Sequence, residues 1–146
     1  PGEILDLMVV NSQVLKANPK LGRALVGAWY ETLAVMKAGD AKSKAALEVM
    51  AKASGTDLAG FEAQLKTTYM YWTPAAALAA ATNPELVSKM QLVRDFSFGH
   101  GLLGSGAPNA NVVGIEFPGG KLLGDPKNVK MRFDTTFMKL AADGKL

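Results

Sequence analysis

The spacing of apolar residues after position 18 predicts an amphipathic helix. Apolar side chains recur at steps of three and four residues, at Leu21, Leu25, Ala28 or Trp29, Leu33 and Met36. This period places them on one face of a helix. Asn18 is a favourable N-cap residue, Pro19 suits the first helical position, and Gly39 suits the left-handed residue that ends a helix. We therefore predict one helix from Pro19 to shortly before Gly39.

Three further helices are expected from capping signals of the same kind. Asp40 is a capping residue for a second helix that ends at Gly55, and a third helix is expected over residues 57–66. A fourth helix begins at Asn83-Pro84, which repeats the Asn-Pro start of the first. Short helices that are separated by single capping residues indicate a compact helical layer rather than a long coiled coil.

Other stretches indicate extended chain. Residues 4–10 (ILDLMVV) are almost continuously apolar, and the length and flanks of this run predict a buried strand rather than a helix. In residues 67–74 (TTYMYWTP), Tyr69 and Tyr71 alternate with Thr68, Met70 and Trp72 until Pro74 stops the run, which predicts an extended segment. Residues 111–117 (NVVGIEF) predict a short strand, and a last helix is expected from Asp134 or Thr135.

Three glycines after the fourth helix have the spacing of a dinucleotide-binding turn, Gly99-x-Gly101-x-x-Gly104. Such a turn needs the glycines after a strand and before a helix, so that the helix N-terminus meets the phosphates. Here they follow a helix, whose C-terminus carries partial negative charge. We therefore predict a helix end that leads into a loop-rich tail, residues 105–146, and we expect His100 to be a surface residue beside it.

Composition excludes several classes of site. The 146 residues are 49% hydrophobic and 20% charged with a net charge of +3, which is ordinary for a single folded domain. The absence of cysteine excludes thiolate nucleophiles, zinc–thiolate sites and disulfides. No apolar run approaches the ~20 residues of a membrane span, and no basic cluster of the kind that binds nucleic acid is present. The single histidine, His100, has no cysteine or second ligand at helical spacing beside it and no oriented partner for acid–base catalysis. We therefore predict no metal site, no cofactor and no catalytic group.

Five residues are candidates for ligand binding. Glu3 precedes the predicted first strand and Asp6 lies within it, and each is either a solvated or paired carboxylate or an acceptor for a ligand N–H group. Tyr69, Tyr71 and Trp72 either fill a core or line a ligand cleft. Of these three we expect Tyr69 or Tyr71, rather than Trp72, to be exposed.

The segment DLMVVNSQVLKANPKLGRALVGAWYETLAVMKAG resembles the C-terminal half of ABC-transporter substrate-binding proteins of the nitrate/sulfonate/taurine type. Members of that family pair an Asp-bearing apolar strand with a helix of the form xNPxxxxALvxAWyea. The positions of this chain that fill the pattern are Asp6, Val9, Val10, Asn18, Pro19, Ala24, Leu25, Ala28 and Trp29. The later stretches AALEVMAKASGTDLAGFEAQL and NPELVSKMQLVRDFSFGHGLL are similar to family helices, so the resemblance covers nearly the whole chain.

The resemblance implies an α/β fold, the helix-rich C-terminal portion of a two-lobed type II periplasmic binding protein with few strands. Residues 1–12 would be a hinge-crossing strand, residues 13–104 the helical part of the first lobe, and residues 105–146 a tail that ends in a helix. The chain would then be a fragment whose partner is the N-terminal half of the same protein. The implied function is periplasmic capture of a small polar molecule (a sulfonate, nitrate, a urea-like amide or a pyrimidine) by lobe closure, and delivery to ABC permease subunits.

Under the resemblance, a carboxylate near the hinge matches Glu3 or Asp6, and the aromatic segment approaches the cleft mouth. The protein would not be an enzyme. Two other functions stay open. One is an enzyme of the same superfamily that builds a pyrimidine precursor, which would need His100 in its cleft. The other is a helical module that docks a partner protein through its Met- and Ala-rich faces.

Overall fold

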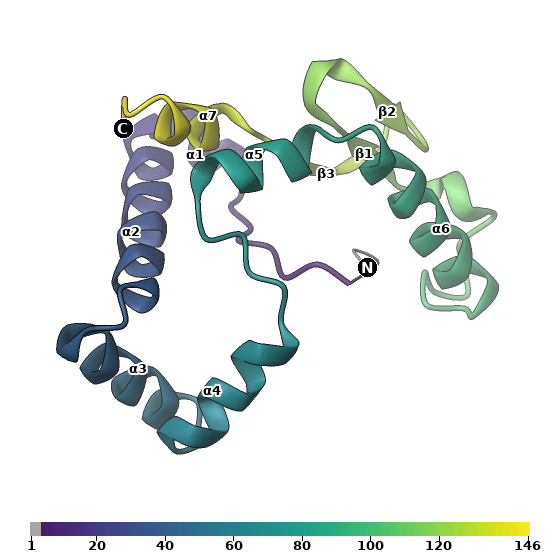
Figure 1. Ribbon diagram of the computed structural model, residues 1–146. Coiled ribbons are helices and arrows are strands. Elements are labelled where there is room, and N and C mark those ends of the chain that lie inside the picture. The colour runs from purple at the N-terminus through teal and green to yellow at the C-terminus, as the bar shows by residue number, and fades with distance from the viewer. Residues whose placement is uncertain (1–3) are drawn as a thin grey trace. The chain divides into compact units, whose positions relative to one another are not determined.

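The computed structural model describes residues 4–146, which divide into two compact units (Figure 1). The sheet unit combines residues 4–12 with Leu78–Thr136 and contains the three described strands. The helical unit combines Gln13–Ala77 with Phe137–Leu146, and its described residues form helices and connecting segments. In α5 (Pro74–Thr82), Pro74–Ala77 belong to the helical unit and Leu78–Thr82 to the sheet unit.

Three helices in succession form the body of the helical unit, as Figure 1 shows: α2 (Pro19–Lys37), α3 (Ala41–Ala53) and α4 (Leu58–Thr67). α3 packs against both of its neighbours. The predicted boundaries are confirmed, because Gly39 and Gly55 have positive φ angles of 72° and 75° after α2 and α3. The short helix α1 (Ser12–Ala17), which precedes α2, was not predicted.

Side-chain caps begin α3 and α4. The Asp40 carboxylate accepts a hydrogen bond from Ser43 N at 2.7 Å, and Asp57 accepts one from Gly60 N at 2.8 Å. Asn18 precedes α2 as predicted, but its side chain makes no capping hydrogen bond. α2 thus starts with Pro19 at its first position and without a side-chain cap.

A small interior links α2 to α3. Leu33 is 2% exposed and Ala51 is 1% exposed. Ser43 is equally buried, and its hydroxyl donates a hydrogen bond to Met36 O at 2.8 Å. Because Ser43 N is also bound by the Asp40 cap, one residue fixes the start of α3 against the end of α2.

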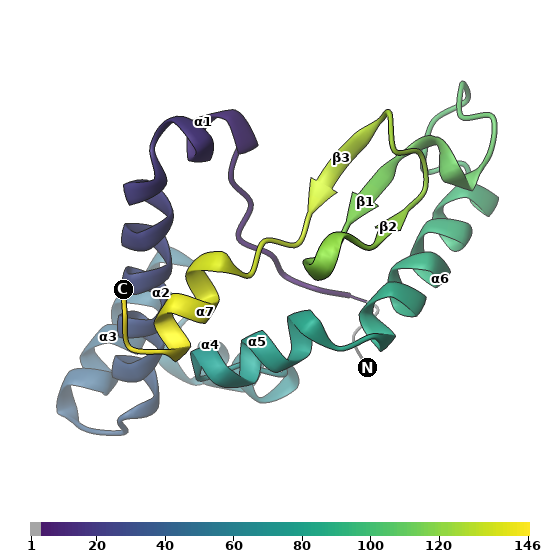
Figure 2. The ribbon, with the colours of Figure 1, turned by 90° about the horizontal axis from the view of Figure 1, so that it is seen from above.

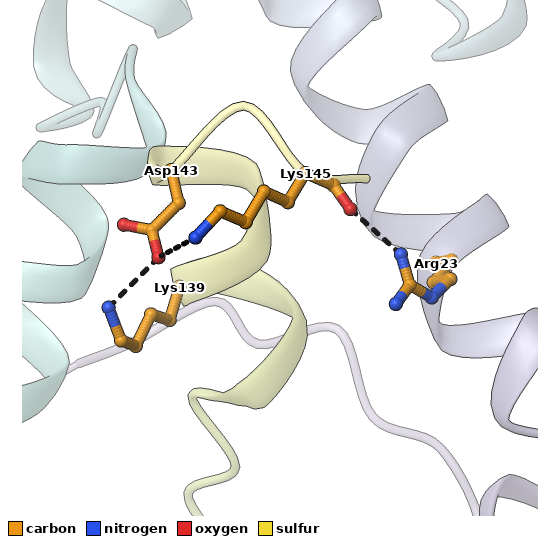
Figure 3. Close-up of polar contacts among 4 residues, drawn as sticks. All are labelled: Arg23, Lys139, Asp143 and Lys145. Carbon is orange, nitrogen blue, oxygen red and sulfur yellow. Dashed lines mark hydrogen bonds and ion pairs between the residues drawn. The ribbon is translucent and has the colours of Figure 1, made fainter.

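The last helix, α7 (Thr136–Ala142), packs against the first half of α2. Gly22 is buried where the ring of Phe137 lies directly on the helix backbone. Beyond the helix, Arg23 Nη1 donates a hydrogen bond to Lys145 O at 2.8 Å (Figure 3). The predicted start of this helix is confirmed to within two residues, since Asp134 Oδ1 accepts a hydrogen bond from Thr136 N.

The sheet unit is built on α6 (Glu85–Gly99) and a three-stranded sheet of order β2-β1-β3, which lies alongside α6 in Figure 2. β1 (Gly114–Glu116), the predicted short strand, runs antiparallel to β2 (Leu122–Leu123) and parallel to β3 (Val129–Arg132). Two single-turn 3₁₀ helices, Ala110–Val112 and Pro118–Gly120, flank β1. The core contains Leu86 and Met90 of α6 and Phe117 after β1.

The glycines after α6 end the helix, as predicted. α6 stops at Gly99, and Gly101 and Gly104 have positive φ angles of 70° and 89°. His100 is the C-cap residue. No helix follows these glycines directly, so a phosphate-binding helix N-terminus is absent from this turn.

The prediction of a buried strand over residues 4–10 is wrong. These residues belong to no strand, and most are exposed, with Val9 80% exposed. A strand is stabilised by hydrogen bonds to a neighbouring strand, and among residues 4–146 the three strands pair only with one another, in the order β2-β1-β3. Leu5 alone packs against the core of the sheet unit.

Three other elements were not predicted: β2, β3 and α5. Residues 105–146, expected to be a loop-rich tail with one short strand and a final helix, contain all three strands of the sheet. The described residues are therefore helix-rich with a small mixed sheet, which agrees with the predicted α/β class.

Candidate functional site

Of the two predicted acidic residues, Glu3 lies outside the described residues. Asp6 is exposed in the extended segment before α1. An exposed carboxylate remains hydrated at little cost. Asp6 is therefore accessible to a ligand, and it belongs to the sheet unit.

The predicted aromatic residues lie together between α4 and α5, in the helical unit. The rings of Tyr69 and Tyr71 meet edge to face, with their centroids 5.2 Å apart and an interplanar angle of 70°. Tyr69 is 81% exposed and Tyr71 37%, whereas Trp72 is half-buried. The expectation that the tyrosines rather than the tryptophan are exposed is confirmed.

Both ends of this aromatic segment are fixed by local hydrogen bonds. The hydroxyls of Thr67 and Thr68 both donate to Gln64 O in the last turn of α4. At the other end, Thr73 Oγ1 accepts a hydrogen bond from Ala76 N, and Pro74 begins α5. The edge-to-face pair therefore projects from a short connection that is anchored on a helix at each side, a surface suited to stacking with a flat ligand.

His100 is exposed at the end of α6. Its ring stacks on Phe96, with 3.9 Å between centroids, and its Nδ1 lies 2.9 Å from Phe96 O. Because a carbonyl oxygen only accepts hydrogen bonds, this contact assigns the proton of the neutral ring to Nδ1 and leaves Nε2 as an acceptor. No described carboxylate orients the ring, and the residues 4–146 contain no cluster of three or more metal-ligating side chains.

One feature of the sheet unit was not predicted. Glu116 of β1 and Arg132 of β3 are register partners, and Arg132 Nε donates to Glu116 Oε2 at 3.0 Å. The pair borders an open hollow of about 370 Å³ at the end of the two strands, next to Asp134. A second hollow, of about 200 Å³, is bordered by the end of α5, by Asn83-Pro84 before α6 and by the turn after β1, and it shares Phe117 and Pro118 with the first.

Among residues 4–146, two titratable groups have clearly shifted pKa values, both in the helical unit. Burial raises the pKa of the Tyr30 phenol on α2. The hydrogen bond from Lys139, together with the positive charges of Lys139 and Lys145, lowers the pKa of Asp143 (Figure 3). Neither group adjoins the aromatic segment in sequence, and the shifts arise from burial at Tyr30 and from the neighbouring lysines at Asp143.

Within residues 4–146, no helix combines the length and the apolar character needed to cross a membrane. Comparison with family models, with curated proteins and with solved structures found no match to this chain.

Proposed function

We propose that this chain is part of a periplasmic solute-binding protein that captures a small polar molecule and delivers it to the membrane subunits of an ABC importer. The observation that carries the proposal is the Asp-bearing apolar segment followed by the Asn-Pro helix. The proposal is also supported by α2, because Pro19–Lys37 is one uninterrupted helix, as the sequence pattern of that family requires.

In its finer form the proposal is a two-lobed type II binding fold, with the ligand held between lobes. The role proposed for Tyr69 and Tyr71 is a stacking wall, and their exposure supports it, since the rings are available to a ligand without rearrangement. Asp6, and Glu3 with it, would accept hydrogen bonds from ligand N–H groups. An exposed carboxylate gains most from such bonds when closure removes water from it.

Titration calorimetry tests this function on the whole polypeptide that contains these residues. The probes are an alkylsulfonate, nitrate, urea and a pyrimidine, and saturable binding of one of them is expected. Absence of heat with all four would overturn the proposal.

Substitutions then test the residues. Tyr69→Ala and Tyr71→Ala are each expected to weaken binding by about tenfold or more, because one stacked ring contributes roughly 1.5 kcal/mol. Val49→Ala is the matched control, since Val49 is 70% exposed on α3 and has no proposed role. If both Tyr variants bind the ligand as tightly as the control variant, Tyr69 and Tyr71 do not contact the ligand.

A further inference from the structure

The hollow beside Glu116 and Arg132 lies entirely within the sheet unit and has no part in the function proposed above. Its volume of about 370 Å³ is in the lower part of the ~300–1,000 Å³ range of small-molecule pockets. We propose that it binds a small zwitterion, a molecule the size of an amino acid that carries one ammonium and one carboxylate group.

The carboxylate would be recognised by Arg132. The strand register holds this guanidinium in place, because Arg132 pairs with Glu116 across β1 and β3 and Phe133 N donates to Glu116 O at 2.9 Å. The ion pair with Glu116 uses only Nε of Arg132. Within residues 4–146 its two terminal nitrogens have no hydrogen-bond partner, and these two donors form the planar fork that binds a carboxylate in bidentate fashion.

The ammonium group would be recognised by Glu116 and Asp134. Glu116 binds Arg132 through Oε2, which leaves Oε1 as an acceptor. Asp134 Oδ1 accepts from Thr136 N at 2.8 Å, and this bond orients the carboxylate while Oδ2 stays available. The charged lining is one guanidinium and two carboxylates, so it carries excess negative charge and favours a ligand with a cationic end over a simple anion.

The remaining walls suit a compact molecule. Phe117 and Phe133 stack with 5.3 Å between centroids and give the hollow an apolar side. At its rim Gly119 and Gly120 have positive φ angles of 82° and 79°, and a Cβ atom at either would meet nothing within 4 Å. The rim is therefore bare backbone, which leaves the charged groups open to an entering ligand.

NMR titration of the 146-residue chain with L-alanine tests the proposal, followed at the backbone amides of Phe117 and Phe133. Propionate and ethylamine, which each carry one of the two charges, are the comparison probes. We expect saturable shifts with L-alanine, and binding of each single-charge probe weaker by about tenfold or more, the effect of losing a hydrogen bond to a charged group. Equal chemical-shift changes with all three probes, or none with any, would show that Glu116 and Arg132 form only a solvated ion pair, and would overturn the proposal.

Two variants assign the roles. Arg132→Gln should abolish the chemical-shift response to propionate, and Asp134→Asn should abolish the response to ethylamine. Each variant should also weaken the binding of L-alanine. Lys130→Gln is the matched control, because Lys130 is an exposed residue of the same strand that does not border the hollow. Retained L-alanine binding in folded Arg132→Gln, checked by its amide spectrum, would contradict the proposal.

Discussion

Each compact unit contains a close contact at a glycine, but the two contacts differ in kind. In the helical unit, the ring of Phe137 from α7 packs on α2 at Gly22, so the contact is between a side chain and the surface of a helix. In the sheet unit, Gly124 and Gly114 allow two backbone segments to meet. A Cβ at Gly124 would overlap the Val113 carbonyl, and one at Gly114 would overlap the Asp125 carbonyl.

The two backbone segments of the sheet unit are joined by hydrogen bonds as well. Asp125 N donates to Asn111 O at 2.9 Å, and Gly114 N donates to Asn128 O at 2.9 Å. A ring can rotate or withdraw when a methyl group is added beside it, whereas a hydrogen-bonded backbone cannot move without losing its partners. The sheet unit should therefore tolerate added atoms less well than the helical unit.

The largest effect is expected for Gly124→Ala. Gly124 has a φ of 87°, so alanine would cost ~1–2 kcal/mol in backbone conformation and a further ~1–3 kcal/mol from overlap with Val113. Urea denaturation should show the combined loss of ~2–5 kcal/mol. Gly119→Ala is the control, because its φ is 82° but a Cβ there has open space, so only the conformational cost applies. Equal losses in the two variants would mean that the backbone contact has no energetic role.

Arg94→Met should stabilise the sheet unit. Arg94 of α6 is 9% exposed, and its Nε and Nη1 atoms are buried with no hydrogen-bond partner among residues 4–146. Its nearest charged neighbour is Asp95, at 3.8 Å from Nη2. Replacing a poorly compensated buried ion by an apolar side chain of similar length is often neutral to stabilising, by up to ~4 kcal/mol. A loss of stability on urea denaturation would show that the guanidinium is well compensated in solution.

Gly22→Ala sharpens the contrast from the helical side. Alanine favours a helix by ~1 kcal/mol over glycine, but here its methyl group would displace the Phe137 ring, which costs ~1–3 kcal/mol. Gly27→Ala lies in the same helix, and its Cβ would meet only Leu146 Cδ1 at 3.9 Å, so this variant should gain stability. Their free energies of unfolding, measured by urea denaturation, should differ by ~1–3 kcal/mol. Equal values would show that the contact between Phe137 and Gly22 does not limit the space on α2.

The helical unit was largely predictable because its signals are local. Asp40 and Gly55 mark the ends of α3 within a few residues of it, and each acts on its own neighbours. α5 was missed because its alanine-rich sequence has no apolar stripe and so no helical period. The sheet depends on pairing between residues far apart in the sequence, such as Glu116 with Arg132, and no local pattern in VKMR distinguishes a strand from the helix beyond it.

The same difference explains what was found and missed in the candidate sites. The exposure of Tyr69 and Tyr71 follows from their position in a short extended connection, which the sequence shows directly. The hollow beside Arg132 exists only once β1 and β3 are in register, so no spacing along the chain indicates it. The prediction for residues 4–10 failed in the opposite way, since their apolar composition is that of a strand but none of the three described strands pairs with them.

The caps of the helical unit allow a direct test of local signals. Asp40→Ala removes the hydrogen bond to Ser43 N and should cost ~1 kcal/mol, the usual value of an N-cap side chain. Asn18→Ala is the matched control, because Asn18 precedes α2 but makes no capping hydrogen bond, and it should cost almost nothing. Thermal denaturation measures the stability of both variants. If Asn18→Ala loses as much stability as Asp40→Ala, the residue type at the N-cap position, and not the capping hydrogen bond, determines the stabilisation.

The smallest effect is expected at the end of α7, where Asp143 accepts a hydrogen bond from Lys139 at 3.0 Å. This bond lowers the pKa of Asp143 in the folded chain, so the carboxylate stabilises the fold above its unfolded-state pKa and loses that effect as the pH falls through the lower folded-state value. The stability difference between wild type and Asp143→Asn should therefore be present at neutral pH and shrink as the pH falls below the unfolded-state pKa of Asp143 and through its lower folded-state pKa. In a Lys139→Met background the pH dependence of that difference should diminish, because the largest cause of the shift is gone. If it persists unchanged, the positive charge of Lys145, whose Nζ lies 3.8 Å from Asp143 Oδ2, rather than the hydrogen bond from Lys139 lowers the pKa of Asp143.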